Sequence, residues 1–281
     1  MTPGRTELET NVGMFSQCWA EAWHALRPRF VIALLPLAAV EAIWLWALST
    51  FPRPPLDTFL VPAWYLLAGE PALHYPEALA ALPRIAGWSM PLLVWLVGVP
   101  IFVYVLPRLP AVFLGQSAGS NPSRGGLGAA WIATLPGALA GTFGLVAADA
   151  AAGSPTSPVD ALARELFALA FLGVGLVARM LFAYALPSVV LGGLSPPRAW
   201  RRSVEFAVRY LGLSSAFVLV EVLFTLALRV PPTFLLGLFE RTFPGLGLWV
   251  AGGGLLGAWL GTWFILAATT RLYLHRFGVE G

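Results

Sequence analysis

Long apolar runs separated by arginine-rich segments are the feature of this sequence that most restricts its fold. Of its 281 residues, 58% are hydrophobic and only 11% are charged, whereas a soluble globular domain carries about 25% charged residues. The mean hydropathy is +0.77. A soluble core of this size has no room for so much apolar surface, so the composition indicates a polytopic membrane protein.

The apolar runs predict an all-α membrane helix bundle, because a transmembrane helix needs about 20 mostly apolar residues. The N-terminus is polar and the first apolar run is long enough to span, which argues against a cleaved signal peptide. We expect one integral membrane domain over residues 1–281. Its six expected spans are 30–50, 90–107, 127–148, 165–187, 210–230 and 246–270. Prolines in the second span are tolerated where neighbouring groups satisfy the freed carbonyls.

The placement of arginine predicts the orientation. All 17 basic residues are arginines. With the N-terminus inside, eleven arginines fall in inner segments and five in outer segments. The positive-inside rule then places both chain ends in the cytoplasm. The lack of lysine, with abundant Ala, Gly, Pro and Leu, indicates a GC-rich bacterial genome, so the expected location is the bacterial cytoplasmic (inner) membrane.

Two segments read as amphipathic interfacial helices, at 14–27 and 196–209. In the second, Trp200, Val204, Ala207 and Leu211 share one helical face, which we expect to lie against the inner leaflet. The arginines would then lie among anionic headgroups. They serve either ordinary positive-inside topology or a dedicated lipid or partner site. The candidate lipid-headgroup or partner-facing residues are Arg198, Arg201, Arg202 and Arg209.

The outer loop 51–88 contains two apolar, proline-broken stretches that are too short to span. We expect helices packed at the outer interface, or a lid over a cavity.

Two glutamates and one arginine lie deep in the expected spans. Sliding the chain by 180 residues aligns Arg29 with Arg209 and Glu41 with Glu221. Twelve helical residues cover about 18 Å, which puts both carboxyl groups near mid-membrane. A charge there is costly and needs a partner. Arg179 is predicted to pair with Glu41, Glu221 or both, either as a clamp that fixes helix register or as a proton or substrate site.

Small residues at four-residue spacing predict close helix packing. Gly253, Gly257 and Gly261 lie in the last expected span, and Gly137 and Gly141 lie in the third. Either a helix of the same bundle or a second copy of the chain could fill these grooves.

The usual signatures of enzyme chemistry are missing from the sequence. No HExxH motif, P-loop or paired-glutamate protease motif occurs, and the histidines His24, His74 and His275 all lie outside the spans. The single cysteine, Cys18, excludes an internal disulfide and a multi-cysteine metal site. We therefore expect no enzymatic activity, no metal and no cofactor, and nothing in the charge balance indicates nucleic acid.

Two stretches carry a resemblance to a known family. AWRRSVEFAVRY (199–210) and TRLYLHRFGVEG (270–281) resemble segments of six-span bacterial proteins related to the membrane domain of glycerophosphodiester phosphodiesterases. His275 stands where that family usually has aspartate, and Val204 where an aromatic residue is common. The resemblance implies six spans with a cytoplasmic elbow, and no catalytic domain. The matching residues are Ala199, Arg201, Arg202, Ser203, Leu272, Tyr273, Arg276, Glu280 and Gly281.

Two functions fit these patterns. The first is a non-enzymatic subunit or scaffold of a larger membrane assembly, with membrane lipids and other protein subunits as partners. The second is a transporter-like permease that uses the buried Glu41, Glu221 and Arg179, together with a separate ATPase.

Overall fold

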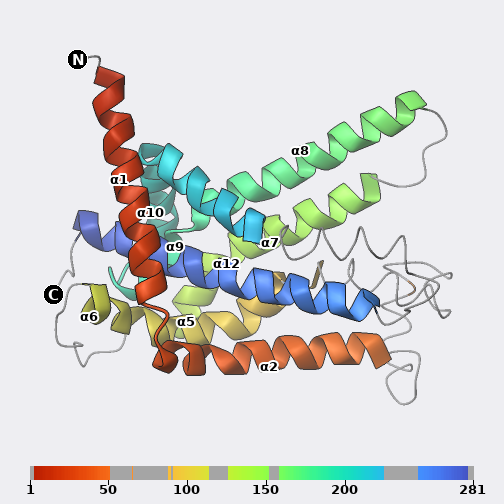
Figure 1. Cartoon of the computed structure of the whole chain (residues 1–281), viewed down its shortest axis with the longest axis horizontal. Coiled ribbons are helices and arrows are strands. Elements are labelled where there is room, and N and C mark those ends of the chain that lie inside the picture. Colours follow the sequence, from red (N-terminus) through yellow and green to blue (C-terminus); the bar gives the residue numbers. More distant parts are fainter. Residues whose placement is uncertain are drawn as a thin grey trace.

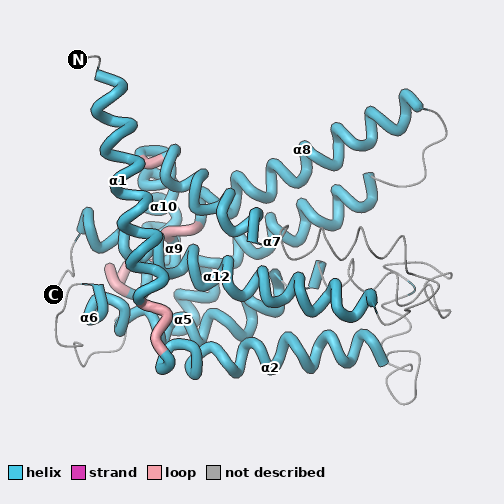
Figure 2. The backbone as a smooth tube through the Cα atoms, in the orientation of Figure 1, coloured by secondary structure: helices cyan, strands magenta, loops and turns pink. Residues whose placement is uncertain are grey.

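The computed structural model describes residues 3–50, 65, 88–89, 91–113, 126–151, 158–224 and 246–277. Within these ranges the chain is helical, with short turns and no strand (Figure 2). The helices are α1 (Pro3–His24), α2 (Pro28–Thr50), η2 (Val94–Gly98), α5 (Val99–Val105), η3 (Leu106–Arg108), α6 (Leu109–Phe113), α7 (Leu127–Ala151), α8 (Pro158–Phe182), α9 (Ala185–Val190), α10 (Pro196–Arg209), the Leu211–Phe224 helix and α12 (Leu246–Phe277).

Four helical stretches are long and apolar enough to cross a membrane: Phe30–Ala47, Pro91–Phe113, Leu127–Ala148 and Glu165–Val190. A fifth candidate is α10 with the Leu211–Phe224 helix, which together form a pair bent by 97°. The sixth expected span, 246–270, is helical throughout as part of α12. The all-helical class is therefore confirmed for the described residues, and four to five helices have the length and hydropathy of membrane spans. Six crossings and their orientation stay predictions. The expected segments 51–64, 66–87 and 225–230 lie outside the described residues.

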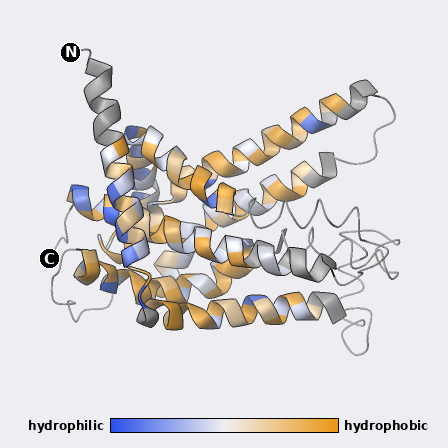
Figure 3. Ribbon diagram, viewed as in Figure 1, coloured by the Kyte–Doolittle hydropathy of each residue, from blue (hydrophilic) through white to orange (hydrophobic). Residues whose placement is uncertain are grey.

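The long helices run alternately in opposite directions. In Figure 1, α2 and α12 run in opposite directions, and the last turn of α2 lies near the first turn of α12. We call the end that holds α10 and Arg271–Phe277 the elbow end. Figure 3 shows that hydrophilic residues gather there, while α2, α7 and α8 are mostly hydrophobic. This separation suits a bundle with one polar end and an apolar middle.

The second span is irregular around its prolines, and a side chain of α7 supplies a hydrogen bond to a carbonyl that proline leaves without its helical donor. Pro100 has no amide proton to offer the carbonyl of Leu96, four residues earlier. The indole of Trp131 on α7 donates to that carbonyl at 3.3 Å. The indole of Trp95 donates in return to the carbonyl of Trp131 at 3.0 Å. The five residues before α5 form a π-helix, η2.

Helices α7 and α8 form a tight hairpin through small residues. A Cβ built on Gly144 would lie 2.9 Å from the carbonyl of Phe171 and 3.2 Å from the Cα of Gly175. The expected packing role of Gly137 and Gly141 is partly seen. A Cβ on Gly137 would lie 3.5 Å from the Cβ of Phe182, and a Cβ on Gly175 would lie 3.8 Å from the Cα of Gly141, but nothing lies within 4 Å of a Cβ on Gly141. The tightest contact therefore lies one turn further along α7.

Both amphipathic helices pack more deeply on the protein than expected. Helix α1 lies across α12, where Cys18, Ala22 and the following Ala25 are buried. Its Trp19 ring lies 4.7 Å from the ring of Phe264. In Figure 1, α1 stands at a steep angle to α2.

The buried face of α10 differs from the predicted apolar face. The buried residues are Ala199, Ser203, Phe206 and Ala207, whereas Leu211 lies beyond α10 and is exposed. The reason is that α10 caps α7, α8 and α9, and small side chains let it approach them closely. Figure 1 shows α10 over this part of the bundle.

Candidate functional site

The charged pair of the spans joins α8 to the Leu211–Phe224 helix. The guanidinium Nη2 of Arg179 donates to Oε1 of Glu221. The side chain of Glu221 is 7% exposed and that of Arg179 is 40% exposed. A Cβ on Gly261 of α12 would lie 2.6 Å from the Cγ of Glu221, so the backbone of α12 packs directly on the glutamate. The pair is thus closed on its carboxylate side and open on its guanidinium side.

Of the three glycines predicted to form a groove on α12, Gly261 is in close contact with Glu221 of the Leu211–Phe224 helix. Gly257 is buried and Gly253 is half-buried. For Gly261, the partner is a helix of the same chain.

Glu41 does not join this pair among the described residues. Of the three predicted alternatives (Glu41, Glu221 or both), the structure shows the pairing of Arg179 with Glu221. Ring contacts set the levels: Phe30 lies 5.8 Å from Trp263, and Phe217 lies 5.9 Å from Phe264. Glu221 is level with Gly261, two residues from Trp263 on α12. Glu41 lies eleven residues further along α2 than Phe30, which is level with Trp263. The two carboxyl groups are therefore separated by about 13 Å along the bundle. Although a shift of 180 residues aligns Glu41 with Glu221 in the sequence, the two carboxyl groups do not lie at the same depth in the bundle.

A hydroxyl from α10 bridges the break between α8 and α9. Ser203 Oγ donates to the carbonyl of Leu181 at 2.6 Å and accepts from the amide of Tyr184 at 3.1 Å. The hydroxyls of Tyr184 and Ser214 are 2.8 Å apart, and Ser188 Oγ donates to the Tyr184 carbonyl at 2.7 Å. Tyr184 and the three serines are buried, so the network satisfies backbone groups that the break would leave unpaired.

The two family-like stretches meet at the elbow end. Arg202 Nη1 donates to the hydroxyl of Tyr273 at 3.2 Å, and its guanidinium carbon lies 4.3 Å from the ring centroid of Phe277. A Cβ on Gly192 would lie 2.5 Å from the same hydroxyl, so only glycine fits there. Gly193 follows with φ of 63°, a conformation that glycine adopts without strain. Arg202 thus packs on aromatic side chains of α12 and is half-buried. Its expected contact with headgroups or a partner stays a prediction.

The other three arginines of α10 are exposed. Arg201 forms an exposed pair with Glu205 at 2.8 Å, and Arg198 and Arg209 are exposed without a described partner. Their proposed contact with headgroups or a partner stays a prediction.

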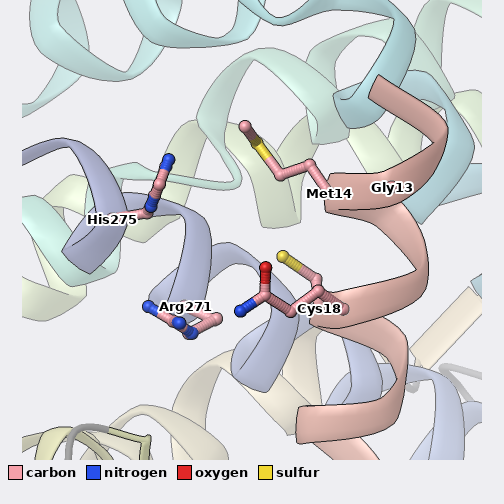
Figure 4. A pocket seen from close by; sticks show the side chains of 6 residues that line it. Gly13, Met14, Cys18, Arg271 and His275 are labelled. Carbon is pink, nitrogen blue, oxygen red and sulfur yellow. The ribbon is translucent and has the colours of Figure 1, made fainter. Parts of the chain in front are cut away.

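A cavity of about 270 Å³ opens between α1 and α12. Figure 4 shows Met14 and Cys18 of α1 and Arg271 and His275 of α12 around it. The lining residues are Gly13, Met14, Gln17, Cys18, Arg271 and His275. A second space, of about 10 Å³ near Ala22 and Trp263, is too small to hold more than a water molecule.

An ion pair closes one wall of the larger cavity. The guanidinium of Arg271 donates to both carboxylate oxygens of Glu21, with Nη2 at 3.2 Å from Oε1. Gln17 Nε2 also donates to Oε1 at 3.0 Å. Burial raises the pKa of Cys18 to about 11. The positive charge of Arg271 lowers this pKa, and the negative charge of Glu21 raises it. The thiol is therefore protonated at neutral pH and has little nucleophilic character.

Sequence reasoning missed the Glu21–Arg271 pair and the Ser203 network. Ser203 belongs to one of the family-like stretches, but nothing in its spacing indicates the break that it repairs. Across the described ranges, no cluster of three or more His, Cys, Asp or Glu residues has metal-binding geometry. No protein-family model, curated protein or solved structure matches the chain significantly.

Proposed function

We propose that this chain is a non-enzymatic, multi-pass protein of the bacterial inner membrane, with both ends in the cytoplasm, that acts as a subunit or scaffold of a larger membrane assembly. The α7–α8 hairpin supports this role. The candidate spans are 28%, 33%, 17% and 11% buried in chain order, so α7 and α8 are the least covered. Figure 1 shows this hairpin diverging from α2 and α12.

The observation that carries the proposal is the exposure of Arg179. It lies on the same face of α8 as the buried Gly175, one turn away, yet its side chain is 40% exposed. A guanidinium in a span is costly unless its donors are satisfied, and Glu221 is its described partner. A helix from another chain, placed against this side of α8, would supply further acceptors and cover the apolar surface.

The elbow end offers a second kind of contact. Arg198, Arg201 and Arg209 form an exposed cationic face next to the expected inner leaflet. Such a face suits anionic lipid headgroups or an acidic cytoplasmic subunit.

Cysteine cross-linking in native membranes tests the subunit role. In a Cys18→Ser background, Leu176→Cys places a thiol one turn from Arg179 on α8, where Leu176 is 38% exposed. Ile43→Cys on α2, which is 62% exposed, is the matched control. We expect Leu176→Cys to cross-link to a distinct membrane protein, and Arg179→Gln to weaken that cross-link. Equal cross-linking from both positions would contradict the proposal.

The exposed guanidinium also favours a second function, a permease in which the Arg179–Glu221 pair contacts substrate and a separate ATPase supplies energy. Neither cavity described above is lined by this pair, which ranks the permease second. Arg179→Leu separates the interpretations. Loss of folding indicates a structural clamp, whereas a folded variant that has lost only transport indicates a substrate site.

A further inference from the structure

Glu41 stands apart from the other charged groups in the spans. It lies in the middle of α2, is 3% exposed, and is flanked one turn away on either side by the buried Leu37 and Leu45. Throughout the described ranges, no hydrogen bond or ion pair reaches its carboxyl group. Glu221, the other buried glutamate of the described spans, is similarly buried but has the guanidinium of Arg179 as its partner.

Among the described residues, the helices packed on α2 bring no opposite charge to the level of Glu41. These helices are α12, α5 and η2. The titratable and charged groups of α12 lie at Arg271 and beyond, about 28 Å from Glu41 along the bundle, when levels are counted from the Phe30–Trp263 contact. Tyr104 of α5, and Arg108 just after it, also lie toward the elbow end.

The neighbouring helix becomes irregular just beyond the level of Glu41. The indole of Trp44 donates to Ser89 Oγ at 2.8 Å, which fixes the register of α2 against the Pro91–Phe113 stretch. The two helices run in opposite directions, so the three residues from Trp44 back to Glu41 correspond to the three residues from Ser89 to Leu92. The π-helix η2 begins two residues further on, at Val94. A π-helix is rare, costs regular hydrogen bonding and occurs often at functional sites.

We propose that Glu41 is a proton-binding site within the membrane-spanning part of the protein. An unpaired carboxylate in an apolar interior is far costlier than a neutral carboxylic acid, so the group holds a proton. The π-helix next to it provides backbone that can rearrange when the proton is exchanged. This inference goes beyond a subunit role and does not depend on it.

The test uses dicyclohexylcarbodiimide, an apolar reagent that modifies protonated carboxyl groups. The carboxyl proton goes to a nitrogen of the reagent, and the carboxyl oxygen bonds to its central carbon. The product rearranges to a stable N-acylurea, so the peptide gains the mass of the whole reagent and nothing leaves.

The full-length protein in mild detergent is treated at neutral pH and analysed by peptide mass spectrometry. We expect an adduct at Glu41, no adduct in Glu41→Gln, and unchanged labelling of Glu41 in Glu221→Gln. Labelling of the ion-paired Glu221 should be at least tenfold lower. Infrared spectra should show the carbonyl stretch of a protonated carboxyl in the wild type and its loss in Glu41→Gln.

Stability measurements complete the test, because glutamine closely resembles a neutral glutamic acid in shape and charge. Glu41→Gln should unfold at the same temperature as the wild type. Marked destabilisation by Glu41→Gln, the absence of an infrared difference, or equal labelling of both glutamates would each overturn the proposal.

Discussion

Removing the hydroxyl of Ser203 should destabilise the protein more than any other single-atom deletion at its elbow end. In Ser203→Ala, the buried amide of Tyr184 loses its acceptor at 3.1 Å and the carbonyl of Leu181 loses its donor at 2.6 Å. Each buried polar group left unsatisfied costs about 1–3 kcal/mol. Because the break between α8 and α9 prevents these groups from re-pairing within a helix, we expect a total loss of about 2–4 kcal/mol.

The measurement is equilibrium unfolding in mixed micelles of a mild and a denaturing detergent, followed by circular dichroism. The control is Ser215→Ala, in which an exposed hydroxyl bonded to the Gly212 carbonyl at 3.0 Å is lost. Its effect should stay within about 0.5 kcal/mol. If Ser203→Ala and Ser215→Ala lower the unfolding free energy equally, the bridging role assigned to Ser203 is refuted.

Three further predictions concern the elbow end. Gly192→Ala should strongly reduce the folded yield, since its methyl group would lie 2.5 Å from a tyrosine hydroxyl, while Gly212→Ala, with open space around it, should leave the yield unchanged. The alkylation rate of Cys18 by a small iodoacetamide should rise only near pH 11, the pKa that burial gives its thiol. In Arg271→Gln the rate should rise at still higher pH, because the thiolate loses a nearby positive charge. A rise near pH 9, the ordinary pKa of a thiol, in the folded protein would contradict this. Because the folded state holds this proton more tightly than the unfolded state, the contribution of Cys18 to stability is complete below pH 9 and is lost between about pH 9 and 11; Cys18→Ala should remove that part of the pH dependence. Finally, Arg201→Cys without the native cysteine should react with a membrane-impermeant maleimide only from the cytoplasmic side, and labelling from outside would reverse the assigned orientation.

Several aspects of the protein follow from local sequence. The apolar runs predicted the long helices α2, α7, α8 and α12, because span length and hydropathy are local properties of the chain. The amphipathic pattern predicted only the second part of α1, at residues 14–27. The start of α10 at Pro196 follows from two prolines after a serine, where the missing amide protons cost little. The presence of a deep Arg–Glu pair could also be expected, since a lone charge in a span is costly.

Tertiary structure decided which groups meet. Sequence gave no reason to prefer Glu221 over Glu41 as the partner of Arg179, because the choice depends on how far each helix slides along α12. The same holds for Arg202, which a helical wheel places on the polar face but which packs on Tyr273, 71 residues away. Hydropathy determines that a segment is a helix and how far it extends, since both depend on neighbouring residues alone. Side-chain fit between helices, here set by residues such as Gly261 and Ser203, determines which carboxyl group is paired and which is left alone.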